Sequence, residues 1–253
     1  MRFASLGSGS RGNALLIQHK QTTLMIDCGF SLRETEKRLQ QFGLCAGDIS
    51  AVLVTHEHGD HIRGVGGFVK KYATPVYMTY GTYRAANNCE VADLREISPG
   101  EALPIDDLLV MPFAVPHDAV QPCQFSVSDG DSRVGLLTDT GMITPHIVEH
   151  LSGCDALLLE CNHDVDMLMQ GDYPPALKQR VASDYGHLNN TQAAALLGQM
   201  DTRRLSYIAA MHISEKNNQA RLAQQALCGV MGWGEDDIYV ADQEAGLAWF
   251  DLR

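Results

Sequence analysis

The stretch Thr55-His56-Glu57-His58-Gly59-Asp60-His61 holds three histidines and two carboxylates within seven residues. It follows a short apolar run, residues 51–54, that is typical of a buried strand. Because extended backbone alternates its side chains, His56 and His58 can point at one metal ion, and the following turn can bring Asp60 and His61 towards a second. The stretch therefore predicts a metal site with nitrogen and oxygen ligands. The alternative is a polar loop whose histidines only form hydrogen bonds.

Three further potential ligands follow apolar runs later in the chain. His117 comes after residues 108–115, Asp139 after residues 134–138 and His212 after residues 207–211. Strands form a rigid scaffold that presents polar residues at its ends to a shared cleft, so we expect these side chains to meet. A single histidine after a strand more often has a structural role. These three residues indicate a metal site because they occur in this order together with the histidine-rich stretch.

The opening stretch resembles the HxHxDH signature of the metallo-β-lactamase superfamily, and the resemblance extends over nearly the whole chain. It implies an α/β fold of the metallo-β-lactamase type, a four-layer αββα sandwich with a dinuclear metal site at the sheet edge. It also implies the ligands of two ions: His56, His58 and His117 for one, Asp60, His61 and His212 for the other, and Asp139 as the bridge.

The chemistry of such a metal pair limits the reaction. Two ions about 3.5 to 4 Å apart generate hydroxide near neutral pH and stabilise the charge that develops during hydrolysis. We therefore expect hydrolysis by a metal-bridging hydroxide that Asp60 also orients. Two Zn²⁺ or Mn²⁺ ions are expected, and Fe²⁺ is compatible with the same ligands. The ligands alone do not separate a phosphodiester from a thioester or an amide.

Two loops add candidate substrate contacts. In residues 7–13, glycines allow backbone amides to approach an anion, and Ser8, Ser10 and Asn13 add polar groups; a plain tight turn is the alternative. His187 precedes a predicted helix, where it can bind a phosphate or protonate a leaving oxygen. The alternative for this loop is a helix cap formed by Asn189 or Asn190 beside an incidental histidine.

Four motifs together resemble the YycJ-like branch of the superfamily, whose members carry SGSxGN, ExNHD, GHLSN and HLSxxNN. This chain differs at Asn189, usually serine, and at Ile213, usually leucine. The resemblance implies a cytoplasmic, metal-dependent phosphodiesterase, a 5′-to-3′ exonuclease on DNA. It implies catalytic roles for Asp60 and His187, and contacts to substrate or phosphate by a larger set: Ser8, Ser10, Asn13, His163, His187 and Ser214. A small-molecule hydrolase of the glyoxalase II-like thioesterase or cyclic-phosphodiesterase type remains the alternative, because the thioesterase group shares all seven ligands.

Composition bounds the remaining expectations. The 253 residues, 45% of them hydrophobic, can bury a sizeable core, and without a linker-like segment they predict a single domain over 1–253. Residues 1–7 lack a secretion signal and no run is long enough to cross a bilayer, which predicts a cytoplasmic protein without membrane contact. Seven cysteines without a CxxC pair predict buried thiols rather than a disulfide framework.

The net charge of −12 opposes nucleic-acid binding, because phosphate contacts usually draw on an excess of lysine and arginine. Two divalent ions would offset part of this charge locally. Basic residues do occur near the expected mouth of the site: Arg2, Arg11, Arg63, Lys70, Lys71 and Arg84. We therefore expect a small footprint on a nucleic acid, while the oligomeric state stays open.

Hydrophobic periodicity predicts alternating short strands and helices. Strands are expected at 3–6, 14–18, 23–27, 51–54, 75–78, 108–115, 124–127, 134–138, 156–160 and 205–211. Helices are expected at 31–41, 61–72, 145–151, 176–184, 191–199 and 219–231, and a closing hairpin at 238–250.

Overall fold

The computed structural model describes residues 1–86, 89 and 91–252. The chain divides into two compact units. The first unit comprises Met1–Ala114, Ala119–Ser132 and Asp242–Arg253, and the second comprises Val115–Asp118 and Arg133–Ala241. A single domain over 1–253 stays a prediction.

The first unit is built on a mixed sheet in the order β14-β1-β2-β3-β4-β5-β6. Its strands are β1 (Arg2–Gly7), β2 (Ala14–His19), β3 (Thr22–Ile26), β4 (Ala51–Leu53), β5 (Val76–Met78), β6 (Leu94–Glu96) and β14 (Leu247–Asp251). The strands from β14 to β3 pair antiparallel, and those from β3 to β6 pair parallel. The unit also contains the antiparallel strands β7 (Leu103–Ile105), β8 (Leu108–Ala114) and β9 (Cys123–Ser128).

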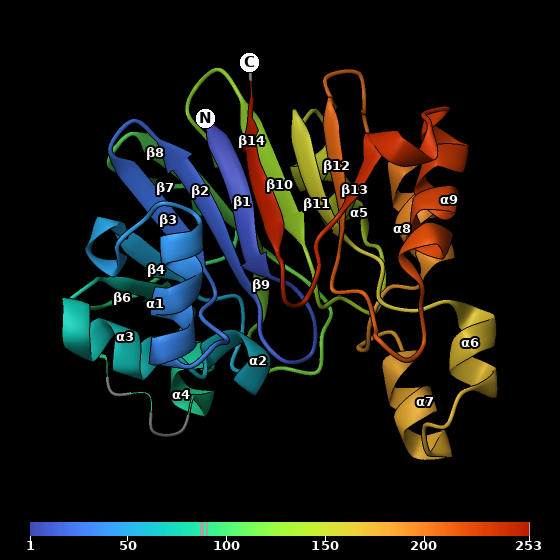
Figure 1. Cartoon of the computed structure of the whole chain (residues 1–253), viewed down its shortest axis with the longest axis horizontal. Helices are drawn as coiled ribbons and strands as arrows, with labels where there is room; N and C mark the ends of the chain where they lie inside the picture. Colours follow the sequence, from blue (N-terminus) through green and yellow to red (C-terminus); the bar gives the residue numbers. More distant parts are fainter. Residues whose placement is uncertain (87–88, 90, 253) are drawn as a thin grey trace. The chain divides into compact units, whose positions relative to one another are not determined.

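Helices cover this sheet through apolar contacts. The helical segments of the unit are α1 (Leu32–Gln41), η1 (Ala46–Asp48), α2 (Gly59–Ile62), α3 (Val65–Tyr72) and α4 (Tyr80–Ala85). The side chain of Ser31 accepts a hydrogen bond from the backbone N–H of Glu34, which caps α1. α1 and α3 lie beside each other on the sheet, where Leu39 and Phe68 pack in one buried cluster with Val52 (Figure 1).

The single helix predicted over 61–72 is wrong, because the structure breaks it between α2 and α3. Gly64 lies at the break and donates its backbone N–H to the carbonyl of Cys28 at 2.8 Å. A Cβ atom at this position would lie 2.1 Å from the carbonyl oxygen of Phe30. The chain therefore approaches the loop after β3 too closely for any side chain, and this contact is invisible in a local sequence pattern.

The second unit is a parallel sheet in the order β10-β11-β12-β13, with helical crossovers. Its strands are β10 (Arg133–Leu137), β11 (Ala156–Glu160), β12 (Tyr207–Met211) and β13 (Ile238–Val240). Its helical segments are α5 (Pro145–Leu151), α6 (Val165–Gln170), α7 (Pro175–Val181), α8 (Asn190–Leu197), α9 (Ala220–Met231) and η2 (Glu235–Asp237). α8 and α9 lie side by side along β12 and β13 (Figure 1).

The hairpin predicted over 238–250 is also wrong. β13 pairs in parallel with β12, whereas β14 pairs antiparallel with β1. Asp242 and Gly246 exchange two backbone hydrogen bonds in the turn between the strands. The crossover helix α9 connects β12 to β13, so β13 runs parallel to β12. The turn after β13 leads into β14, which pairs with β1 and not with β13, so no hairpin forms.

In the described part of the chain, no helix combines the length and apolar character needed to span a membrane. The helix α9 has 12 residues, whereas a spanning helix needs about 20.

The cysteines support the prediction of mostly buried thiols. Cys28, Cys123, Cys154 and Cys161 are buried, and Cys45 is exposed. Burial raises the pKa of Cys28 to about 12 and that of Cys154 to about 11, which suppresses the reactive thiolate. We expect a thiol reagent to label Cys45 rapidly and the four buried cysteines only after unfolding, as peptide mass mapping would measure. Native-state labelling of Cys161 as fast as that of Cys45 would contradict the packing around β11.

Candidate active site

The three histidines of the opening stretch cluster in the first unit, where His56 and His58 follow β4 and His61 lies in α2. His56 and His61 are buried and His58 is half-buried. The ring centroids of His56 and His58 lie 4.6 Å apart, and those of His56 and His61 lie 4.2 Å apart. Asp60 lies in the first turn of α2. The local spacing thus brings three imidazoles and a carboxylate together, as predicted.

Hydrogen bonds to the Nδ1 atoms orient two of these rings. His61 Nδ1 lies 2.7 Å from Asp27 Oδ2, and its Nε2 lies 3.5 Å from Asp60 Oδ2. His56 Nδ1 lies 2.9 Å from the hydroxyl oxygen of Thr55. The hydroxyl and the backbone N–H of Thr55 both donate hydrogen bonds to the Asp27 carboxylate. An imidazole held at one nitrogen by a carboxylate, with the other nitrogen directed to a second carboxylate, fits the donor arrangement of a supported metal ligand.

Asp27 was missed in the sequence, although it ends a predicted strand as Asp139 does. Its backbone φ of 62° lies in the left-handed region. In the second unit, Asp139 and His212 share this conformation, each with a φ of 51°. A non-glycine residue in this region costs about 1–3 kcal/mol and such residues concentrate at functional sites. Polar residues at strand ends therefore carry backbone strain in both units.

The loop before β2 contacts the metal-binding stretch through Asn13. The backbone N–H of Asn13 donates to the carbonyl of Asp60 at 2.8 Å, and its side-chain nitrogen lies 3.1 Å from His61 Nε2. Ser8 is buried and its hydroxyl donates to Asn13 Oδ1, whereas Ser10 is exposed. Asn13 thus lies at the stretch with Ser8 supporting it. The roles of all three residues towards a phosphate stay predictions.

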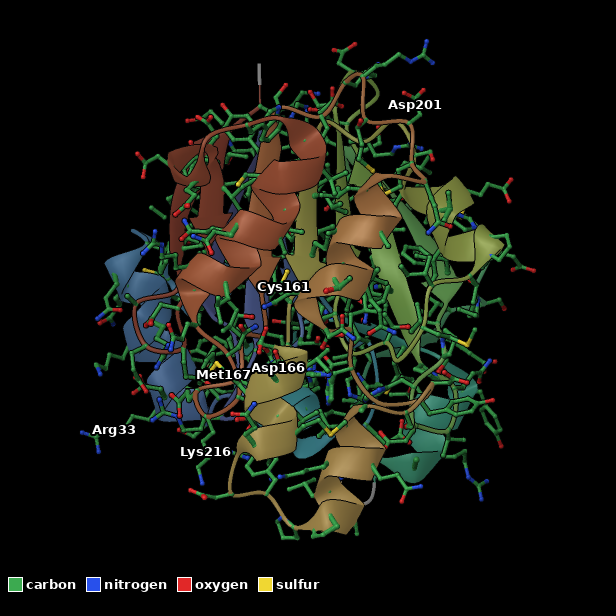
Figure 2. All side chains as sticks on the ribbon, turned by 90° about the vertical axis from the view of Figure 1, so that its right-hand side faces the viewer. Arg33, Cys161, Asp166, Met167, Asp201 and Lys216 are labelled. Atoms are coloured by element: carbon green, nitrogen blue, oxygen red, sulfur yellow. The ribbon has the colours of Figure 1, made fainter. Side chains whose placement is uncertain are left out.

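The second unit gathers four polar side chains near the carboxyl ends of its parallel strands. One potential ligand atom from each lies within 4.8 Å of the others: Asp139, Glu160, His187 and His212. Figure 2 shows Cys161 directly after β11 and Asp166 and Met167 on α6 at this end of the sheet, with Asp201 at the opposite end. Carboxyl ends of parallel strands meet at one edge of a sheet, which explains the cluster. Its nitrogen and oxygen donors fit a divalent ion such as zinc or manganese.

His117 lies beside this cluster in the second unit. Its Nδ1 lies 3.0 Å from the carbonyl oxygen of Gly186, and its Nε2 lies 4.0 Å from Asp139 Oδ1. The ring centroids of His117 and His187 are 5.3 Å apart, and those of His187 and His212 are 5.2 Å apart. The structure therefore brings the predicted residues His117, Asp139, His187 and His212 together within one unit.

Glu160 anchors His187 and is the second residue missed in the sequence. Its Oε1 lies 2.8 Å from His187 Nδ1, and its Oε2 accepts backbone N–H groups of Leu188 and Thr140. Burial alone would raise the pKa of Glu160, but the adjacent His187 holds it below its usual range. Burial would lower the pKa of His187, and the Glu160 carboxylate raises it above its usual value. The signal available in the sequence was again a carboxylate at a strand end.

Two asparagines join the loops that carry His187 and His212. Asn190 and Asn218 exchange two side-chain amide hydrogen bonds of 2.9 and 2.8 Å, and Asn218 also donates to the carbonyl of Cys161. The helix-cap alternative for this loop is present as well, because Asn189 caps α8 in a reciprocal arrangement with Gln192. His187 also forms a hydrogen bond with Glu160, so this loop contains both the helix cap and a histidine that belongs to the cluster.

The two remaining predicted contacts also lie in the second unit. His163 is 1% exposed, and burial lowers its pKa to about 4. Its carbonyl accepts the backbone N–H of Asn190. Ser214 is half-buried, and its hydroxyl oxygen accepts the backbone N–H of Asn217. These placements favour support of the surrounding loops, and direct substrate contact by either residue stays a prediction.

Replacing Asp27 by asparagine is expected to weaken metal binding by about 10- to 100-fold, because the side chain that orients His61 loses its charge and one acceptor oxygen. Titration of the metal-free protein with Zn²⁺ or Mn²⁺ would measure the change. The matched control is Asp106→Asn, since Asp106 is exposed and also has a left-handed backbone, with a φ of 49°. Equal metal affinity in the two variants would exclude this role for Asp27.

Comparison with known proteins places the chain in a family. The model of the beta-lactamase superfamily domain matches residues 22–213. The chain is 35% identical over 246 residues to the exodeoxyribonuclease YycJ of Bacillus anthracis, covering 94% of this chain and 93% of the relative. It is 33% identical over 232 residues to the exodeoxyribonuclease WalJ of Streptococcus pneumoniae, covering 89% and 86%. These relatives confirm the prediction of a hydrolytic enzyme.

A solved structure supports the same assignment at the level of the fold. The metallo-β-lactamase fold protein YhfI of Bacillus subtilis superimposes with a TM-score of 0.77 at 16% identity, over 98% of each chain. The predicted α/β fold of the metallo-β-lactamase type is therefore confirmed. With its sequence matches over most of its length, the chain belongs to the metallo-β-lactamase superfamily, in the branch of the YycJ-like proteins.

Proposed function

We propose that the protein hydrolyses phosphodiester bonds in nucleic acid and acts as a 5′-to-3′ exonuclease on DNA in the cytoplasm. Two relatives that match most of the chain are named as exodeoxyribonucleases. The observation that carries the proposal is the pairing of His187 with Glu160. The side chain of His187 is 21% exposed, whereas those of Glu160, Asp139 and His212 are at most 4% exposed. His187 is thus the residue of the cluster that a substrate can reach.

The proposed ligands of the two ions follow from family membership: His56, His58 and His117 for one, Asp60, His61 and His212 for the other, and Asp139 as the bridge. Supporting contacts within each unit fit this assignment, since Asp27 and Thr55 orient His61 and His56, and Gly186 orients His117. When bound, the divalent ions supply Lewis-acid stabilisation of the developing charge and a water of lowered pKa.

The protein side chains then divide the remaining work. Asp60 orients the attacking water towards the phosphorus atom. Hydrolysis breaks the bond between phosphorus and the 3′ oxygen of the terminal nucleotide, and His187 gives a proton to that oxygen as it leaves. Glu160 holds the Nδ1–H of His187, which directs Nε2 to the leaving group. Asn13, supported by Ser8 and next to Ser10 in the loop, would contact the terminal phosphate, and the remaining strand would keep a new 5′-phosphate.

A substrate panel tests the proposal. The protein would be incubated with Mn²⁺ or Zn²⁺ and with 5′-phosphorylated and 5′-hydroxyl DNA and RNA, with a thioester in parallel. We expect stepwise release of nucleotides from the 5′ end of DNA, abolished by a chelator and restored by adding the metal. Thioester turnover with intact nucleic acid would instead support the small-molecule alternative, and preferential cleavage of RNA would overturn the choice of DNA.

A further inference from the structure

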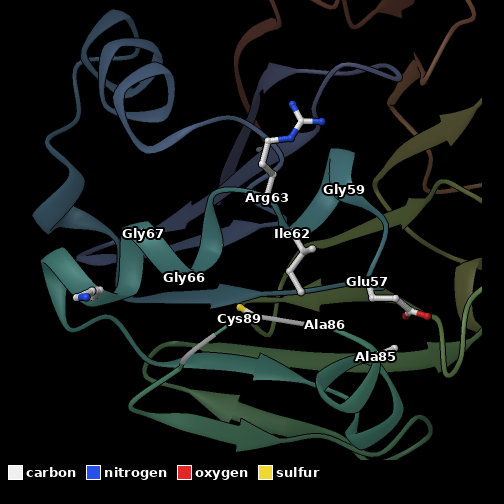
Figure 3. Close-up of a pocket in the computed structure, with 10 residues that line it drawn as sticks. Glu57, Gly59, Ile62, Arg63, Gly66, Gly67, Ala85, Ala86 and Cys89 are labelled. Carbon is white, nitrogen blue, oxygen red and sulfur yellow. The ribbon is translucent and has the colours of Figure 1, made fainter.

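A groove of about 620 Å³ lies in the first unit, directly beside the metal-binding stretch (Figure 3). The wall contributed by the stretch and the two helices after it consists of Glu57, Gly59, Ile62, Arg63, Gly66, Gly67 and Lys70. Ala85 and Ala86 from the end of α4 also line the groove. The groove therefore begins at residues between the predicted ligands and continues along α3.

Two residues of the groove wall are cationic, Arg63 and Lys70, and they are called the basic stripe below. Gly66 and Gly67 lie four and three residues before Lys70 on α3 and share its face of the helix, whereas Arg63 lies at the end of α2, before the break at Gly64.

Gly66 keeps the groove open without a packing reason within the protein. A Cβ atom at Gly66 would meet Cys89 Sγ at 3.9 Å, which is ordinary van der Waals contact. Gly64, two residues earlier, is different, because a Cβ atom there would overlap the backbone of Phe30. Gly66 is the second residue of α3, and a glycine there that packing does not require is consistent with a ligand that approaches the helix backbone closely.

The charges of the stripe are available to a ligand. Arg63 and Lys70 are exposed, and neither forms an ion pair with a residue in the described part of the chain. Lys71, the next residue on α3, differs because its Nζ lies 2.8 Å from Glu36 Oε1. In a protein with a net charge of −12, two exposed cations on one groove wall create a local region that attracts phosphate.

Glu57 is the one acidic side chain of the groove wall. Its Oε1 accepts the backbone N–H of Val120 at 2.8 Å, which holds the carboxylate at the end of the groove next to the stretch. Arg63 and Lys70 outnumber it along the rest of the wall. A strand that runs along α3 therefore meets the cations over most of its path.

We infer that this groove binds the sugar-phosphate backbone of a short single-stranded segment of the nucleic-acid substrate, with Arg63 and Lys70 as its phosphate contacts. The inference rests on the proposed function and adds to it the part of the surface that binds the strand. A volume of about 620 Å³ is that of a small-ligand pocket, so the groove suits a few nucleotides of a single strand. A duplex is much bulkier, since its major groove alone is about 12 Å wide. The stripe also explains how an acidic protein binds a polyanion with a small footprint.

Binding of a fluorescent oligothymidylate of about 12 nucleotides tests the inference, measured by anisotropy with the full-length protein at several salt concentrations. We expect Arg63→Gln and Lys70→Gln each to raise Kd by about 5- to 10-fold and to reduce the salt dependence by about one counterion. Lys71→Gln is the matched control, because it removes the same charge from the same helix outside the groove, and it should bind like the wild type. Equal Kd values for all three variants would overturn the inference.

The shape of the groove gives a second, independent comparison. Gly66→Ala fits the available space, whereas Gly66→Leu would fill the groove, so only the leucine variant should bind the oligonucleotide more weakly. Equal binding by these two variants would also overturn the inference. Cleavage by the wild-type protein separates this inference from the proposed function. If the wild type cleaves DNA and Arg63→Gln binds the oligonucleotide as tightly as the wild type, only the inference about the groove is contradicted. A wild type that binds through Arg63 and Lys70 but cleaves no nucleic acid contradicts the proposed function alone.

Discussion

Replacing Asp60 by alanine is expected to lower the rate of DNA hydrolysis by about 1,000-fold or more. The reason is that the Asp60 side chain is proposed both to bind a metal ion and to orient the attacking water. Asp60 lies in the first turn of α2, with its Oδ2 3.5 Å from His61 Nε2. The variant should also bind fewer than the wild-type number of metal ions. Steady-state cleavage and metal content by elemental analysis would measure the two effects.

The control for this result is Asp236→Ala, which removes an exposed carboxylate from η2 in the second unit. It should retain wild-type turnover and metal content. The thermal unfolding of both metal-free variants should resemble that of the wild type, which separates loss of chemistry from loss of folding. Wild-type turnover and metal content in Asp60→Ala would show that neither role belongs to this residue.

The substitution His187→Ala is expected to lower kcat for DNA by about 100-fold or more with metal content unchanged, because a positioned general acid contributes a factor of this size. A p-nitrophenyl phosphodiester offers a sharper readout, since p-nitrophenolate leaves without needing a proton. The loss on that substrate should be less than about tenfold if His187 acts as the acid. Comparing the losses on the two substrates therefore shows whether His187 acts as the general acid, and not only whether activity depends on it.

His146→Ala is the matched control for this experiment, because His146 is an exposed histidine on α5 of the same unit. It should behave as the wild type on both substrates. Equal losses on DNA and on the p-nitrophenyl ester, together with reduced metal content, would instead identify His187 as a metal ligand. The cluster that it forms with Asp139, Glu160 and His212 makes this second outcome a real chemical alternative.

The groove along α3 would also account for the unfavourable net charge. A global charge of −12 repels a polyanion at long range, but screening limits that repulsion to about 8–10 Å at physiological ionic strength. Contacts at closer range then depend on the local residues, here Arg63 and Lys70. We therefore expect binding of DNA to rest on a few contacts beside the metal site rather than on a broad basic surface.

The sequence by itself determined the family, the type of fold and the local metal motif. His56, His58, Asp60 and His61 lie within six residues, so backbone geometry alone brings them together. The strand ends that carry Asp139 and His212 were also readable, because buried strands leave apolar runs that end abruptly at a polar residue. Periodicity predicted most of the regular elements for the same reason, since it reports which face of a segment is buried.

Only the tertiary structure decided which residues support these side chains and where the chain breaks or changes partner. Asp27 meets His61 across 34 positions and Glu160 meets His187 across 27, so neither contact leaves a local pattern. The end of α2 depends on the approach of Gly64 to the loop after β3, and the separation of β13 from β14 depends on the strands that they pair with. Hydrogen-bond partners and strand pairing are set by contacts between segments far apart in the chain, whereas sequence periodicity records only the burial of each segment along its own length.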